Sequence, residues 1–143
     1  MSKIFEDEFM DAQANSVSLC MEFLENAQAD VDKIYIYMYS DEGAFTFNAF
    51  FEKNKQIIAI TDLTDKSGVR NFVRCGIEDV INIRRVCKEF EKDCPYEIKM
   101  IFDTKSHKFD AQYKYEPIDE EKDISPDFVF MNWENEIKNT LNK

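Results

Sequence analysis

Cysteine and histidine are the side chains of this chain best suited to nucleophilic or metal chemistry. The four cysteines are Cys20, Cys75, Cys87 and Cys94, and the only histidine is His107. A zinc site needs ligands in close pairs, and the chain has no C-x-x-C pair. His107 falls in a predicted hairpin turn between charged neighbours, which favours a solvated turn residue over a general base. We therefore interpret the thiols as small apolar core residues.

Carboxylates offer a second kind of chemistry, because a dense group of them could hold a hard cation. The densest group consists of Asp119, Glu120, Glu121 and Asp123. It lacks the ligand spacing and the turn glycine of a calcium loop. The chain has no G-x-S-x-G, H-E-x-x-H, G-x-x-x-x-G-K-S/T or G-x-G-x-x-G motif, and it has only three glycines. We expect no catalytic residues, no metal and no cofactor, and hence a protein that is not an enzyme.

Tyrosines form the most unusual pattern in the sequence. Tyr35, Tyr37 and Tyr39 share the second face of a predicted hairpin, and Asn48 lies on the return strand of that face. One face of such a hairpin is ordinarily solvated. An aromatic, hydrogen-bonding face without charge is typical of a protein-binding surface. The alternative is that the C-terminal helix with Trp133 covers it, because large aromatic side chains mostly belong to cores.

The tyrosines belong to a predicted antiparallel sheet. Period-two alternation predicts two hairpins, at 33–54 and 96–115, and a short extra strand at 56–60. Gly43 is expected to turn the first hairpin because glycine adopts positive φ. In the second hairpin, one face is predicted to be apolar and the other charged. The composition of 61–68 predicts a loop.

Three helices are predicted from apolar residues that recur every three or four positions. They cover 2–29, 69–93 and the segment that follows Ser125. Ser125 is a good N-cap, and Pro126 suits the first helical position. Gly76 weakens the central helix by about 1 kcal/mol relative to alanine, which predicts a kink or a close approach.

Length and composition restrict the class of protein. A chain of 143 residues is long enough for one domain with a real core, covering 1–143. The order of elements predicts an α+β fold with an antiparallel sheet of four or five strands. No run of about 18 apolar residues exists, so we expect no membrane span. The acidic N-terminus has no continuous apolar stretch and does not resemble a signal peptide, so we expect a cytoplasmic protein.

The net charge of −11 is concentrated at the two ends of the chain. Residues 1–30 hold seven acidic and one basic side chain, and residues 116–143 hold eight and three. Residues 31–115 hold fourteen of each and are neutral. A direct nucleic-acid binder would have the opposite sign. The charge suits a basic protein partner, although solubility alone would also explain it.

Three segments together resemble the YezG-like family of bacterial immunity proteins. They are KIYIYMYSDEGAFTFNAFF, PYEIKMIFDTKSHKFDAQYKYE and SPDFVFMNWENEIKN. The shared features are an aromatic first hairpin, the return strand of the second hairpin and a closing helix with Trp133-Glu134. This resemblance implies an antitoxin that neutralises the toxic domain of a secreted effector, often a nuclease. The expected contacts are the tyrosine face and the acidic segment with Glu120, Glu121 and Asp123, made by a monomer or weak homodimer.

A secretion chaperone is the alternative from another class of protein. Such chaperones have a similar order of helices and strands and hold an effector segment in an extended form. They usually dimerise and have a leucine-rich central helix, whereas the predicted central helix here has no leucine. An inhibitor predicts a one-to-one complex with a folded basic domain. A chaperone predicts a homodimer that grips an extended peptide.

Overall fold

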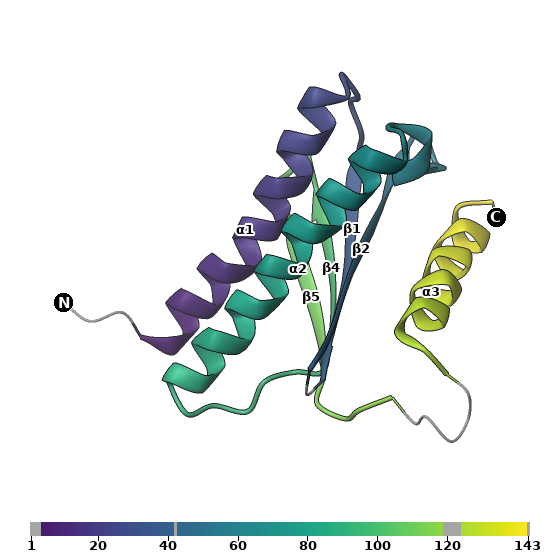
Figure 1. Cartoon of the computed structure of the whole chain (residues 1–143). Coiled ribbons are helices and arrows are strands. Elements are labelled where there is room, and N and C mark those ends of the chain that lie inside the picture. Colours follow the sequence, from purple (N-terminus) through teal and green to yellow (C-terminus); the bar gives the residue numbers. More distant parts are fainter. Residues whose placement is uncertain (1–3, 42, 119–123, 143) are drawn as a thin grey trace.

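Alternating apolar and polar side chains build one antiparallel sheet. The computed structural model describes residues 4–41, 43–118 and 124–142. The sheet has five strands in the order β3-β2-β1-β4-β5 (Figure 1). The strands are β1 (Lys33–Asp41), β2 (Ala44–Lys53), β3 (Gln56–Ala59), β4 (Glu97–Asp103) and β5 (Phe109–Lys114). Gly43, with a φ of 80°, turns the chain between β1 and β2, as predicted.

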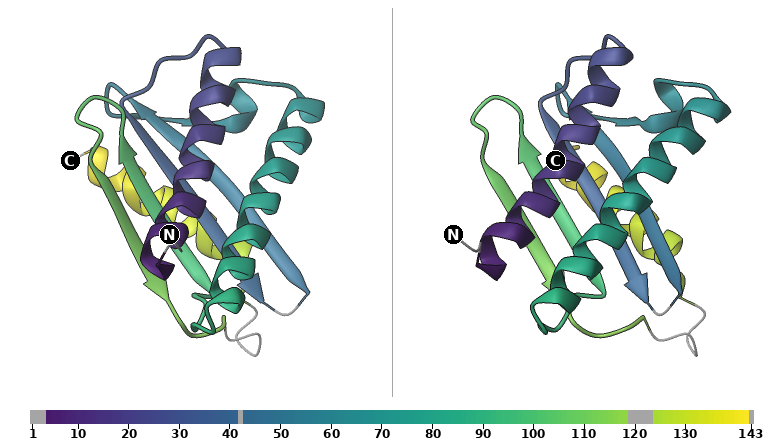
Figure 2. Two further views of the ribbon diagram at one scale, coloured as in Figure 1. Left: turned by 90° about the vertical axis from the view of Figure 1, so that its left-hand side faces the viewer. Right: turned by 60° about the vertical axis from the view of Figure 1, so that its left-hand side comes forward.

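Helices cover both faces of this sheet. α1 (Phe5–Asn26) and α2 (Lys66–Glu89) lie side by side on one face, and α3 (Pro126–Leu141) lies on the other (Figures 1 and 2). A short 3-10 helix, η1 (Ile60–Asp62), follows β3. The predicted α+β class and the order α-β-β-β-α-β-β-α are thus confirmed. None of the helices in the described part of the chain combines the length and the hydropathy that a membrane span requires.

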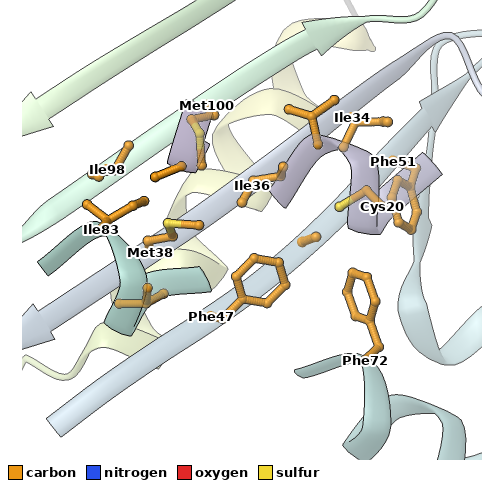
Figure 3. Close-up of a cluster of buried hydrophobic side chains, with 14 of the residues drawn as sticks. Cys20, Ile34, Ile36, Met38, Phe47, Phe51, Phe72, Ile83, Ile98 and Met100 are labelled. Carbon is orange, nitrogen blue, oxygen red and sulfur yellow. The ribbon is translucent and has the colours of Figure 1, made fainter. Parts of the chain in front are cut away.

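The larger core lies between the sheet and the helix pair α1 and α2. Ile34, Ile36 and Met38 alternate along β1 and point into this layer, as the period of two predicts (Figure 3). Cys20 of α1 and Ile83 of α2 meet them from the helical side. A second, aromatic core lies between the sheet and α3. The sheet is therefore apolar on both faces.

A close approach of α2 to the sheet occurs at Gly76, as predicted. A Cβ atom at this position would lie 2.0 Å from Cδ1 of Phe47 on β2. The missing side chain lets the aromatic ring lie against the helix backbone. The buried stripe of α2 accordingly runs through Phe72, Gly76 and Val80, whereas Val73 is only half-buried.

Capping side chains set where two helices begin. Asp65 Oδ1 accepts a hydrogen bond from the Gly68 N–H at 2.8 Å and caps the helix. α2 therefore begins at Lys66, earlier than predicted. The predicted loop at 61–68 is correspondingly shorter. Ser125 Oγ accepts from the Phe128 N–H at 3.1 Å, which confirms the predicted N-cap of α3.

Candidate protein-binding surfaces

The three hairpin tyrosines lie beneath α3. Tyr35, Tyr37 and Tyr39 are only 3%, 0% and 5% exposed. Trp133 of α3 meets Tyr35 edge-on with ring centroids 5.7 Å apart, and Phe130 lies 6.0 Å from Tyr37. The sequence left open whether this face is exposed or covered by the C-terminal helix, and in the structure the helix covers it. A partner could reach these rings only if α3 moved away.

Two buried carboxylates pair with the tyrosine hydroxyls. Tyr35 Oη donates to Glu52 Oε1 at 2.7 Å, and Tyr37 Oη donates to Glu97 Oε1 at 2.8 Å. Both glutamates are buried, with 6% and 8% exposed. Burial, aided by the adjacent carboxylate, raises the pKa of Tyr35 and of Tyr37 well above the usual range, so both hydroxyls stay protonated. These pairs favour the observed arrangement of side chains between the sheet and α3, because any arrangement that leaves a buried carboxylate unpaired is costly.

Sequence reasoning missed these glutamates, although the alternation contained the signal. Glu52 follows Phe50 by two residues and therefore shares the tyrosine face of β2. Glu97 lies opposite Tyr39 in the register of β1 and β4. Glu97 lies on the predicted charged face of the second hairpin, but it is buried there beside Tyr37, on the side of the sheet that carries α3.

The remaining predicted contact residues lie in two places. Asn48 shares the covered face, is half-buried, and accepts a hydrogen bond at Oδ1 from the Ala49 N–H at 2.9 Å. Asp119, Glu120, Glu121 and Asp123 lie outside the described residues. A partner-binding role for the tyrosine face and for the acidic segment stays a prediction.

The exposed side of α1 is acidic along its length. The helix carries six carboxylates and no lysine or arginine. Helical spacing places four of them opposite the buried side of the helix, two in its N-terminal half and two in its C-terminal half. The small side chains of Ala14 and Ser18 lie between these two pairs. We call this surface the acidic face of α1, defined by Asp7, Asp11, Glu22 and Glu25.

Two pockets adjoin the C-terminal half of this acidic face. The first, of about 350 Å³, opens between α1 and α2 and is lined in part by Phe23 and Phe72. The second, of about 650 Å³, opens between α1 and the β4–β5 hairpin and is lined in part by Met21 and Phe102. Glu22 lines both pockets. An apolar wall beside a carboxylate suits a lysine or arginine side chain, whose stem is apolar and whose head is charged.

The chain matches no protein-family model and no curated protein. Comparison with known proteins therefore assigns no function to these surfaces. Within 4–41, 43–118 and 124–142, no group of three or more His, Cys, Asp or Glu side chains is placed to hold a metal ion. The candidate surfaces are therefore defined by the residues of this chain alone. Of these surfaces, the acidic face of α1 combines exposure, charge of one sign and adjoining pockets.

Proposed function

We propose that this protein is an immunity protein, which binds and neutralises the toxic domain of a secreted bacterial effector. The observation that carries the proposal is the acidic face of α1, an exposed helical surface with carboxylates and two adjoining pockets on a helix that contains no lysine or arginine. The resemblance of the hairpins and the closing helix to YezG-like immunity proteins gives separate support. Inhibition by occupying a partner's surface requires no catalytic group in this chain.

The end of α1 carries charge that does not stabilise the helix. Glu25 lies in the last turn, Glu22 lies just before it, and no basic side chain accompanies them. The negative end of the helix dipole disfavours a carboxylate there by about 0.3–1 kcal/mol. A cationic side chain from a partner would remove this repulsion. The same carboxylates therefore weaken the free helix and favour a complex.

A nuclease domain is the partner class that this chemistry fits best. A nuclease must present lysine and arginine side chains to bind the phosphate backbone. An inhibitor with an acidic helix competes with phosphate for those cations, and opposite charges accelerate the encounter. The pockets beside Glu22 would take the apolar stems of the same side chains.

Affinity capture with paired variants tests the proposal. We would immobilise the wild type and the double variant Glu22→Lys, Glu25→Lys, and expose both to lysate of the source organism. The captured protein would be identified by mass spectrometry, sized with its partner by light scattering and assayed for nuclease activity. We expect a folded basic domain in a one-to-one complex, inhibited by the wild type and bound more than about tenfold more weakly by the variant.

Two further variants locate the surface. Glu136→Lys reverses an exposed acidic position on α3, on the other side of the sheet, and should bind like the wild type. Glu120→Lys with Glu121→Lys tests the other acidic segment of the sequence. Equal binding by the α1 variant would contradict the role of α1. A homodimer carrying an extended segment of a secreted protein would establish the chaperone function instead.

A further inference from the structure

The C-terminal end of α2 turns back so that two cysteines meet. The Lys92 N–H donates to the Cys87 carbonyl at 2.9 Å, and the Glu91 N–H donates to the Lys88 carbonyl at 3.1 Å. With Glu91 at a φ of 54°, these bonds form a Schellman motif. The reversal returns Cys94 to the end of the helix, where it packs against the core cluster that contains Cys87, and each thiol shifts the pKa of the other.

The two thiols have different surroundings. Cys87 is 1% exposed and belongs to the larger core. Cys94 is half-buried and lines an open pocket of about 410 Å³ together with Arg84, Tyr96 and Tyr115. A small solute can therefore reach Cys94 from this pocket, whereas Cys87 does not line it and is almost completely buried.

A fixed guanidinium group faces this pocket. Arg84 Nε donates to Ser40 Oγ at 3.0 Å, Nη2 donates to the Ser40 carbonyl at 3.1 Å, and the group lies 5.8 Å from the Tyr96 ring centroid. The neighbouring Cys87 thiol and, to a smaller extent, the charge of Arg84 lower the pKa of Cys94 against the opposing effect of burial, and Asp93 lines the same pocket. The Cys94 thiol, together with burial, raises the pKa of Cys87 above its usual range.

We propose that Cys94 is a peroxide-reactive thiol and that Cys87 is its resolving partner, so that the pair forms a reversible disulfide. The reactive form of a cysteine is its thiolate, and such cysteines lie in partly exposed, electropositive surroundings, as Cys94 does. The site is separate from the acidic face of α1, and the inference does not depend on the proposed function.

The chemistry takes two steps. The Cys94 thiolate attacks one oxygen of a peroxide, the O–O bond breaks, and Cys94 becomes a sulfenic acid while hydroxide leaves; sulfur is oxidised and the peroxide is reduced. The Cys87 sulfur then attacks the Cys94 sulfur. The S–O bond breaks, the leaving hydroxide takes the proton of Cys87 to form water, and the S–S bond forms. A dithiol reductant reduces the S–S bond and restores both thiols.

The other two cysteines lack this arrangement. Cys20 is fully buried, and burial raises the pKa of its thiol above its usual range. Cys75 is exposed but precedes Cys87 on α2 by a helical distance of about 18 Å. Cys75 therefore serves as an internal reference for an accessible thiol without a resolving partner at hand.

Peptide mapping after treatment with hydrogen peroxide tests the proposal on the full chain. Trypsin places the four cysteines in separate peptides, with Cys87 in 86–88 and Cys94 in 93–99. We expect these two peptides to be joined by a disulfide that dithiothreitol releases, with little oxidation of Cys75. In Cys87→Ala, the sulfenic acid on Cys94 should persist and be trapped by dimedone. In Cys94→Ser, Cys87 should stay reduced.

Arg84 variants and a control complete the test. Arg84→Gln should slow alkylation of Cys94 by iodoacetamide several-fold relative to Cys75 in the same molecule, and Arg84→Lys should largely retain the rate. Cys75→Ser should leave the cross-link unchanged. Circular dichroism of each variant checks folding. Peroxide products that join Cys94 only to other molecules, or oxidation of Cys87 in the Cys94→Ser variant at the wild-type rate, would overturn the proposal.

Discussion

Asp79 is a half-buried carboxyl group on α2 whose ionisation opposes folding. Burial, with a smaller contribution from the charge of Glu78, raises its pKa from 3.8 to about 6. Below about pH 4 the group is protonated in both the folded and the unfolded state, so it has no effect on stability. Between about pH 4 and 6 the folded state binds more protons, so the free energy of unfolding falls as pH rises. Above pH 6 the full cost remains.

Replacing this carboxyl group should therefore stabilise the protein only where it is ionised. We expect Asp79→Asn to raise the free energy of unfolding by about 1 kcal/mol near pH 8, after allowance for partial exposure, and to change it little near pH 4. Denaturant unfolding at both pH values measures the difference. Glu78→Gln, at an exposed neighbouring position, is the control and should have a smaller effect. A gain of equal size at both pH values would contradict the assignment.

The tyrosine–glutamate pairs make a second prediction at the scale of residues. Tyr37→Phe removes the hydroxyl that donates to Glu97 Oε1 and leaves a buried carboxylate without this donor. We expect a loss of about 2–3 kcal/mol in the free energy of unfolding. In a Glu97→Gln background the same change should cost less, and a double-mutant cycle measures the coupling. Additive losses would show that the pair contributes no specific energy.

At the scale of elements, the contact between α2 and β2 depends on a missing side chain. A methyl group at Gly76 gains about 1 kcal/mol of helix propensity but meets the Phe47 ring at 2.0 Å. The other glycine of α2, Gly68, would place a methyl group against the Thr64 side chain at 1.9 Å. Thr64, whose Cβ would also lie 2.9 Å away, belongs to a half-buried bend outside the helices and strands that can shift, whereas the Phe47 ring is held in the core.

Gly76→Ala should therefore destabilise the protein in spite of its better helix propensity. We expect a net loss of about 1 kcal/mol or more, because overpacking a core typically costs about 1–3 kcal/mol. Gly68→Ala is the matched control and should cost clearly less. Thermal or denaturant unfolding compares them. Equal effects of the two variants would mean that the contact with Phe47 relaxes without cost.

At the scale of the whole molecule, charge of one sign destabilises the free protein and favours the proposed complex. The net charge is −11, and α1 has no basic side chain to compensate its six carboxylates. Like charges repel one another in a compact fold, and dissolved salt screens this repulsion. The attraction between an acidic helix and a basic partner is screened in the same way. Salt should therefore act with opposite signs on folding and on binding.

Raising sodium chloride from about 0.01 M to about 0.15 M should increase the melting temperature of the free protein and weaken the complex. Glu22→Lys with Glu25→Lys should raise the free energy of unfolding by about 0.3–1 kcal/mol, mainly through Glu25 in the last turn, while it weakens binding of the partner. Calorimetry of the free protein and binding titrations at both salt concentrations provide the two readouts. Loss of stability in this variant would attribute its weaker binding to misfolding.

Local patterns in the sequence were enough to predict which segments are helices and strands and which face of each is apolar. The alternation along β1 and β2 defines both faces of the first hairpin, and the side chain of Ser125 marks the start of α3. These features depend on backbone geometry and on neighbours a few residues away, so a local pattern contains them. The start of α2 was missed because Asp65 lies within a stretch of loop-like composition.

What covers each face could be learned only from the folded protein. Period-two alternation places the tyrosines on one side of β1, but only the packing of α3 buries them and pairs them with Glu52 and Glu97. The contact between Gly76 and the Phe47 ring, and that between Cys87 and Cys94, likewise depend on how the chain returns on itself. A periodic pattern fixes the direction of a side chain, whereas its partner is chosen by the packing of distant segments.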